Sequence, residues 1–374
     1  MHPAIAALTE GFLARHPVPG MALAVSHNGE VTHEWSHGFR NREGLLPAMS
    51  RSRFGIASIT KVFTAIAILQ LQDAGRLLVS DHVLRYLPEL RIPNVDQVTL
   101  HHLLTHTSGL PALGTEPYAA ASSDPDMPVL PPLGRAGRTH IDSVDELVQL
   151  LGELEIEPVG MPGTRMSYSN DGFALLGLIV ERVSGMEFAT YVRERITVPL
   201  GLGETHFGPV GTVGGGTRRY YQAPSGRQLI TLPVADTRSA MALIGAGGGP
   251  QLSNPQNLLR LMEVLRCNGL VDGRRLLSKA AVEQMLTPHA TVSPGTWYGY
   301  GLYLWQAPDG GLLVGHNGGD VGVAASVLLS LTDGIGVAVQ ANLGATVCHL
   351  AQQLMNALRG TAGEVPAEPM LVTR

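Results

Sequence analysis

A serine and a lysine three positions apart, in Ser58-Ile59-Thr60-Lys61, have the spacing most suggestive of chemistry. Side chains three residues apart share one face of a helix, so the lysine amine can reach the serine hydroxyl. Lysine is scarce in this chain: of the 26 Lys and Arg residues, only Lys61 and Lys279 are lysines. Arg cannot lose its proton in a protein, whereas a buried Lys can. Ser58 is therefore a candidate nucleophile and Lys61 a candidate base; the alternative is an N-cap serine with a lysine that reaches solvent.

The helix that Ser58 opens is apolar nearly all round, which is typical of a buried helix. It carries Ile59, Val62, Phe63, Ile66, Ile68 and Leu69. Burial disfavours the ammonium form, so we expect the pKa of Lys61 to lie below the usual value of about 10.4. A lowered pKa would leave neutral amine available to act as a base.

A second candidate pair, Tyr168 and Asn170, stands just before a predicted helix. Side chains alternate along an extended segment, so the phenol and the amide face the same side. A tyrosine beside a lysine ammonium can ionise and act as a general base, and an asparagine amide can hold a substrate carbonyl. The alternative is a turn asparagine at a helix start, which is a commoner use of this pattern.

A third segment, Gly315-His316-Asn317-Gly318-Gly319, leads into a predicted pair of strands. Its glycines would let a substrate approach the strand backbone closely. The alternative is an Asn-Gly hairpin turn with an exposed histidine.

The elements that must position these residues follow a simple order, with strand patterns at both ends of the chain and helical patterns in the middle. This order predicts an α/β fold of the α+β type: an antiparallel sheet flanked by helices and built from both chain ends, with an inserted helical subdomain. We expect one catalytic domain over 1–360, with an α/β part at roughly 1–60 and 290–360 and a mainly helical part at roughly 61–289. Residues 361–374 would form a C-terminal tail. The predicted strands are 21–26, 31–38, 298–305, 312–315, 324–331 and 336–342, with a hairpin turn at Asn28-Gly29 between the first two. The predicted helices are 4–15, 58–74, 143–154, 172–184, 188–196, 255–267, 278–285 and 347–358. Residues 211–216 and 245–249 are predicted glycine-rich loops.

In this order, the three motifs resemble the Ser-x-x-Lys, Tyr-x-Asn and Lys/His-x-Gly elements of the serine β-lactamase and penicillin-binding-protein superfamily. The chain is most similar to the class C β-lactamases and their relatives, the family VIII esterases and the D-stereospecific peptidases and amidases. The segments 103–110 (LLTHTSGL), 162–164 (PGT) and 199–202 (PLGL) also look like recurrent family segments. The resemblance covers most of residues 18 to 345.

The resemblance implies a serine hydrolase that acts through an acyl-enzyme on ester or amide bonds, without a cofactor or metal. Ser58 would be acylated, Lys61 would take its proton or tune Tyr168, and Tyr168 would serve as general base. Asn170 would bind the substrate carbonyl. The wall of the site would be His316, Asn317 and Gly318, and the backbone N–H groups of Ser58 and Gly319 would form the oxyanion hole.

One position departs from the antibiotic-hydrolysing pattern, because the third motif begins with His316 instead of Lys. At neutral pH histidine is mostly uncharged, so the cation that grips a β-lactam carboxylate is missing. This favours a carboxylesterase or a D-aminoacyl peptidase or amidase. An acyltransferase, a true β-lactamase or DD-peptidase, and a binding protein that is acylated without turnover remain the alternatives.

Other site types have weaker support in the sequence. His101, His102 and His106 lack the Glu of an H-E-x-x-H arrangement, which disfavours a metal site. The Gly-x-Ser-x-Gly pentapeptide of an α/β-hydrolase is absent. Cys267 and Cys348 are too few for a disulfide framework.

The composition limits the classes of molecule that we expect this protein to bind. A net charge of −5 and a pI near 6.3 disfavour nucleic acid as a partner. No signal peptide or membrane-spanning run is visible, so we expect a cytoplasmic protein that acts on a small ester, amide or short peptide. The Pro-rich segment 111–140 is expected to be a lid, a binding loop or a flexible segment. The oligomeric state stays open.

Overall fold

The computed structural model describes residues 3–111, 143–207, 216–222, 229–231, 246, 251–320, 322–344 and 346–361. Within these residues the largest element is a nine-stranded sheet in the order β10-β11-β12-β13-β14-β15-β1-β2-β3. All neighbouring strands in it are antiparallel. The strands are β1 (Gly20–His27), β2 (Glu30–Asn41), β3 (Leu46–Pro47), β10 (Ala290–Ser293), β11 (Thr296–Tyr298), β12 (Tyr303–Gln306), β13 (Leu312–Asp320), β14 (Val323–Ser330) and β15 (Ile335–Ala341).

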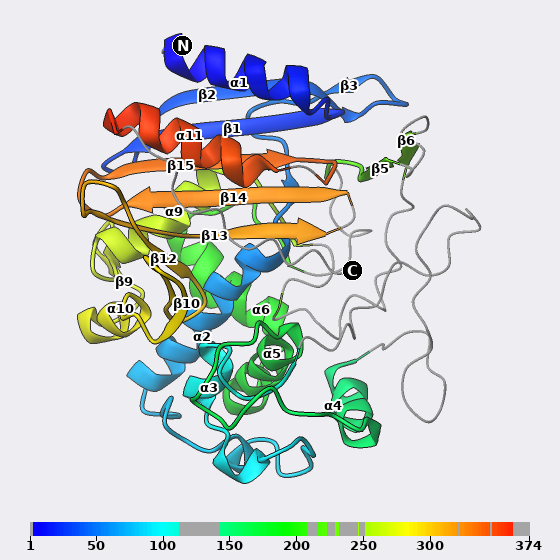
Figure 1. Ribbon diagram of the computed structural model, residues 1–374, viewed down its shortest axis with the longest axis vertical. Helices are drawn as coiled ribbons and strands as arrows, with labels where there is room; N and C mark the ends of the chain where they lie inside the picture. Colours follow the sequence, from blue (N-terminus) through cyan, green and yellow to red (C-terminus); the bar gives the residue numbers. More distant parts are fainter. Residues whose placement is uncertain are drawn as a thin grey trace.

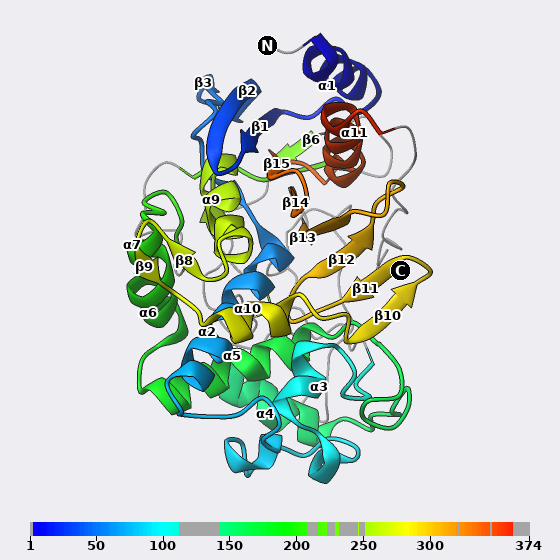
Figure 2. The ribbon, with the colours of Figure 1, turned by 90° about the vertical axis from the view of Figure 1, so that its left-hand side faces the viewer.

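The two chain ends meet in the middle of this sheet, where Met21 of β1 lies opposite Ala341 of β15. Helices α1 (Pro3–Arg15) and α11 (Val347–Arg359) cover one face of these strands, and α9 (Pro255–Arg266) covers the other (Figures 1 and 2). Because both faces are covered, β1 is buried along nearly its whole length. The predicted fold class, an antiparallel sheet built from both ends with helices between, is confirmed.

The helical part is arranged around α2 (Thr60–Asp73), which is buried on nearly every side as its apolar sequence predicts. Below the sheet in Figure 1, α2 packs against α5 and α6, and α5 in turn contacts α3 and α4. The helices here are α3 (Leu100–Leu104), α4 (Val144–Glu153), α5 (Asn170–Ser184), α6 (Phe188–Val192), α7 (Val198–Leu200) and α10 (Lys279–Met285). Short elements complete the described chain: η1 (Ala57–Ile59), η2 (Val83–Arg85), η3 (Val95–Gln97), β4 (Phe54–Gly55) paired with β7 (Leu252–Ser253), β5 (Tyr220–Gln222) with β6 (Leu229–Thr231), and β8 (Leu270–Val271) with β9 (Arg274–Arg275).

Three predicted elements differ from the structure. The strand predicted over 312–315 continues to Asp320 as β13, so the third motif lies within the strand. The strand predicted over 298–305 is two strands, β11 and β12, separated by a turn at Gly301 with φ +70°. A Cβ at Gly301 would lie 2.5 Å from the Lys61 carbonyl oxygen, so glycine lets this turn pack against the start of α2. The helix predicted over 188–196 ends as an α-helix at Val192 and continues as a π-helical turn, Arg193–Thr197.

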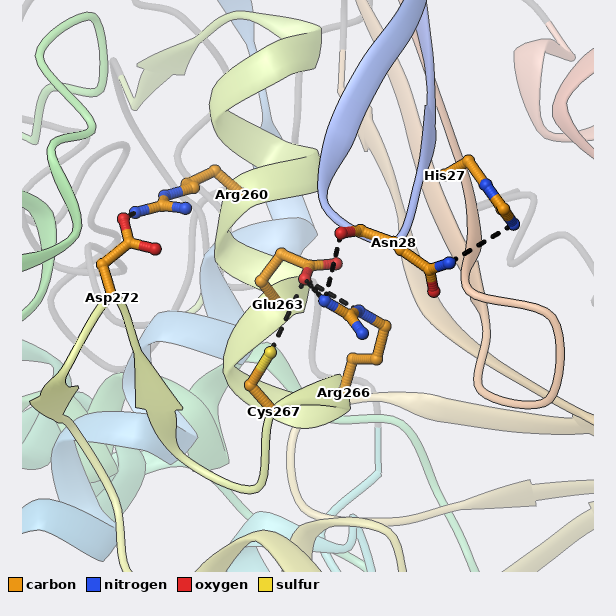
Figure 3. A network of polar contacts seen from close by, with 7 residues as sticks. All are labelled: His27, Asn28, Arg260, Glu263, Arg266, Cys267 and Asp272. Atoms are coloured by element: carbon orange, nitrogen blue, oxygen red, sulfur yellow. Dashed lines mark hydrogen bonds and ion pairs between the residues drawn. The ribbon is translucent and has the colours of Figure 1, made fainter.

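The predicted Asn28-Gly29 hairpin turn joins β1 to β2, with φ angles of +51° and +85° as a type I′ turn requires. The turn rests on α9, as Figure 3 shows. Arg266 donates from Nη2 to the Asn28 carbonyl (3.2 Å) and to Oε2 of the buried Glu263 (2.6 Å). Arg266, held by its ion pair with Glu263, therefore links the β1–β2 turn to α9.

Several predicted features lie largely or wholly outside the described residues: the Pro-rich segment 111–140, the glycine-rich loops 211–216 and 245–249, and the tail 361–374. The division into 1–60 with 290–360 and 61–289 stays a prediction, and α9, from the second range, packs on β1, β14 and β15. None of the described helices has the length and apolar character needed to cross a membrane. The cytoplasmic location stays a prediction.

Candidate active site

Ser58 lies in the tight turn η1, which runs directly into α2. The residue before it, Ala57, has φ +41°, a left-handed conformation that is disfavoured by roughly 1 kcal/mol for a residue with a Cβ. Ala57 and Ile59 are both buried, so the surrounding packing holds this conformation in place. The N–H groups at the start of a helical segment have no acceptor within the helix, and Ser58 supplies one of them.

The Lys61 amine is fully buried and makes the central contacts of the site. Its Nζ lies 3.0 Å from Ser58 Oγ, 2.6 Å from Asn170 Oδ1 and 2.6 Å from the Ala246 carbonyl oxygen. The last two atoms can only accept, so each takes an N–H from the amine. Towards Ser58 the amine presents an N–H when it is charged and its lone pair when it is neutral. A hydroxyl can accept or donate, so this contact is satisfied in both states and provides a path for a proton.

Tyr168 and Asn170 meet Lys61 from the start of α5. The amine lies 4.7 Å from the centre of the Tyr168 ring, and Asn170 is the first residue of the helix. Ser169 between them caps α5, because its hydroxyl accepts from the Gly172 N–H (3.2 Å). Its neighbours can therefore both turn towards the lysine, as the alternation along an extended segment predicts.

Strand β13 brings the third motif against the Ser58 turn. A Cβ at Gly318 would lie 2.1 Å from the Ile56 carbonyl oxygen, so only glycine allows this close approach. Gly319 is exposed, and a Cβ there would meet nothing within 4 Å. Asn317 faces the neighbouring strand, where its Oδ1 accepts from the Ser326 hydroxyl (2.7 Å). Of the two glycines, Gly318 is thus the one that packing requires.

His316 is buried within β13, with 1% of its surface exposed, so the alternative of an exposed hairpin histidine is wrong. Burial, with the nearby charge of Lys61 as the second cause, lowers the pKa of His316 to about 3. The neutral ring donates from Nδ1 to the Asn317 carbonyl (2.6 Å), which leaves Nε2 to accept from the Tyr298 hydroxyl (3.1 Å). His316 therefore brings no positive charge to the site near pH 7.

His106 also belongs to this group, although its sequence context identified it only as part of the segment LLTHTSGL. Helix α3 ends in a Schellman motif: the His106 N–H donates to the Leu103 carbonyl (3.3 Å) and the Thr107 N–H to the His102 carbonyl (2.8 Å). His106 takes the left-handed position of this motif, with φ +57°, where glycine or asparagine is usual. Its side chain is 1% exposed.

The His106 ring packs on Tyr168, with the two ring centres 4.2 Å apart. Burial is the main cause that holds the pKa of His106 well below its usual value, followed by the charge of Lys61. The neutral ring accepts the Ser169 N–H at Nδ1 (3.0 Å), and the His106 carbonyl accepts the Ser167 N–H (2.7 Å). The positive φ that places this ring cannot be read from the residue type, and nothing in the sequence singles out Tyr298 or Ala246.

The other histidines considered for a metal are used within the protein. His102 accepts the Thr99 N–H at Nδ1 (3.2 Å), and His101 Nδ1 lies 2.7 Å from the Tyr300 hydroxyl. In the part of the chain that the structure describes, His, Cys, Asp and Glu side chains do not gather in threes in a way that could hold a metal ion.

Comparison with known proteins agrees with this geometry. Residues 5–353 match the family described as Beta-lactamase. The chain belongs to this family. A penicillin-binding protein of Bacillus subtilis is 28% identical over 322 residues, which cover 84% of this chain and 66% of the relative. Esterase EstB of Burkholderia gladioli is 28% identical over 300 residues, or 75% of this chain and 74% of the esterase.

Among solved structures, the D-stereospecific amidohydrolase of a Streptomyces species superposes with a TM-score of 0.75 at 26% identity, covering 97% of this chain and all of that one (100%). The relatives therefore include a penicillin-binding protein, an esterase and an amidohydrolase. The predicted superfamily and the predicted enzyme class, a serine hydrolase, are confirmed. The type of bond cleaved differs among the relatives.

Proposed function

We propose that the protein hydrolyses small ester or amide substrates through an acyl-enzyme on Ser58. The proposal rests mainly on the position of the Lys61 amine. The amine lies 3.0 Å from Ser58 Oγ and is held there by hydrogen bonds to Asn170 and Ala246. A serine hydroxyl is a weak nucleophile until a neighbouring base takes its proton. Lys61 and Tyr168 are the groups in reach of this role.

In the proposed reaction, the Ser58 oxygen attacks the substrate carbonyl while its proton passes to Lys61 or, through the amine, to Tyr168. The negative charge on the carbonyl oxygen is held by the N–H groups of Ser58 and Gly319; one such donor is worth about 3 kcal/mol of transition-state stabilisation. The same proton then goes to the leaving alcohol or amine as the carbonyl–heteroatom bond breaks. Water, deprotonated by Tyr168, then attacks the acyl carbonyl; the bond between this carbonyl and Ser58 Oγ breaks, the acid leaves, and the proton on Tyr168 returns to Oγ.

The proposed substrate preference rests on the charge state of His316. His316 is neutral and buried, with its pKa at about 3, so it does not supply the cation that the resemblance associates with binding a β-lactam carboxylate. We therefore favour acyl groups without a carboxylate next to the scissile bond, as in simple esters and amino acid amides. Asn170 would hold the substrate carbonyl, with Asn317 and Gly318 in the wall of the site.

Hydrolysis of p-nitrophenyl butyrate by wild-type protein and by Ser58→Ala tests the proposal. We expect steady turnover by wild type, an added butyryl mass on the Ser58 peptide after rapid quenching, and neither in Ser58→Ala. Equal rates in the two proteins would refute the nucleophile. A single burst without turnover would instead identify a protein that is acylated without hydrolysis, and a rate increase with added amine would identify acyl transfer.

A further inference from the structure

His106 occupies a backbone position that normally selects against it. As the left-handed residue of the Schellman motif after α3, it stands where glycine has no steric penalty and asparagine a small one. Local rules are broken in this way mainly where a side chain is needed for something else. The question is therefore what the imidazole does that the turn does not require.

His106 makes two hydrogen bonds and one ring contact to the segment around Tyr168, and its ring also packs on Phe173 and Tyr298. Its carbonyl accepts the Ser167 N–H (2.7 Å) and its Nδ1 accepts the Ser169 N–H (3.0 Å), so the backbone is held on both sides of Tyr168. Between these two bonds the imidazole packs on the Tyr168 ring, with centres 4.2 Å apart. The same Tyr168 ring contacts the Lys61 amine, which lies 4.7 Å from the ring centre.

We propose that His106 is a positioning residue that clamps the segment 167–169 and thereby sets where Tyr168 and Asn170 meet Lys61. The clamp requires the neutral ring, because a protonated Nδ1 could not accept the Ser169 N–H. It also requires the tautomer with its proton on Nε2, an atom with no hydrogen-bond partner among the described residues. The inference deepens the proposed function and rests on it.

The chain offers a pair of variants that separates this role from folding. His106→Gly and His106→Asn both suit the left-handed backbone. Asparagine places Oδ1 close to the position of Nδ1 and can still accept the Ser169 N–H, whereas glycine cannot. His102→Ala is the matched control. His102 lies in α3, just before His106, and its Nδ1 also accepts a backbone N–H, that of Thr99.

Steady-state kinetics with p-nitrophenyl butyrate should show that His106→Gly loses about 100-fold in kcat with KM changed less than about threefold, the effect of a misplacement near 1 Å. His106→Asn should recover at least about tenfold of this loss. The acid limb of kcat/KM should move about one pH unit higher in His106→Gly, because a Tyr168 that has moved from the lysine loses the charge that favours its phenolate. His102→Ala should retain wild-type kcat and pH profile even where its thermal midpoint falls.

Equal kcat losses in His106→Gly and His102→Ala would overturn the inference, as would an unmoved pH limb or an asparagine variant no better than glycine. If His106→Gly does not fold, His106→Gln replaces it in the comparison. The Gln amide extends past the Nδ1 position and should not accept the Ser169 N–H, so we expect a loss of kcat in this variant as well. Ser58→Ala is assayed in parallel: activity there would refute the proposed function, whereas an inactive Ser58→Ala with a fully active His106→Gly would refute the clamp alone.

Discussion

Replacing Gly318 by alanine tests whether the site depends on contact between β13 and the Ser58 turn. The new Cβ would lie 2.1 Å from the Ile56 carbonyl oxygen and 2.9 Å from its carbon. Both are backbone atoms, so no side chain can rotate away, and the strand and the turn must separate by about 1 Å to restore van der Waals contact. A misplacement of that size lowers an enzymatic rate by about 100-fold, and the overpacking destabilises the fold by about 1–3 kcal/mol.

The measurement is kcat/KM for p-nitrophenyl butyrate together with the thermal midpoint, and Gly319→Ala is the control. A Cβ at position 319 meets nothing within 4 Å, so this variant should keep wild-type stability. Its activity should stay within about fivefold of wild type, because its N–H, the proposed oxyanion donor, is unchanged. Gly318→Ala should fall about 100-fold at a temperature where both proteins are folded.

Two results would refute this reasoning. If Gly318→Ala kept wild-type kcat/KM, the approach of β13 to the turn would not control the nucleophile. If Gly319→Ala lost as much activity as Gly318→Ala, the effect would lie in substrate access to the strand, and the steric argument would be wrong.

Three further predictions concern charge. Lys61→Arg should slow acylation, measured by stopped flow, by about 10²–10⁴-fold because it removes the amine that can shed a proton; acylation at the wild-type rate would exclude a lysine base. His316 has a folded pKa of about 3 against 6.5 when exposed, so its contribution to stability is complete above pH 6.5 and is lost as the pH falls, by up to about 1.4 kcal/mol per pH unit. His316→Gln should therefore flatten the acid side of a plot of thermal midpoint against pH, and parallel curves would contradict the assignment. Arg266→Ala should lower the free energy of unfolding in urea by about 3 kcal/mol because it leaves the buried Glu263 carboxylate without its partner; adding Glu263→Gln should restore part of that loss, and a loss below about 0.5 kcal/mol would show that the pair is replaceable.

The fold could be predicted closely because its signals are local. The Asn28-Gly29 turn, the apolar helix after Ser58 and the strand patterns at both ends each follow from residue type and spacing. The break between β11 and β12 could not be predicted, because it depends on Gly301 packing against the Lys61 carbonyl, a contact between residues 240 positions apart in the chain. A sequence pattern shows the alternation of side chains along a strand, but it does not show which distant part of the protein makes the strand turn.

The candidate site shows the same limit. Ser58, Lys61, Tyr168, Asn170 and His316 were predicted from three motifs, and the structure brings them together around one amine. His106, which follows α3, was not among the predicted site residues, because its importance comes from a left-handed φ and from contacts to a distant segment. Ala246 acts through its carbonyl oxygen, and a main-chain acceptor has no signature in the residue type.

The lysine itself shows why burial alone does not decide which group is the base. Burial favours the neutral amine, and the expectation of a lowered pKa for Lys61 rested on burial alone. The structure adds oxygen acceptors at Asn170 and Ala246, each 2.6 Å from Nζ, and acceptors stabilise the charged form. His316 acts in the same direction, because a neutral ring does not repel an ammonium as a second lysine would. A charged Lys61 would make Tyr168 the base, with the amine as the cation that lowers the energy of the phenolate. The choice of His at position 316 therefore bears on the chemistry at Ser58 as well as on the substrate.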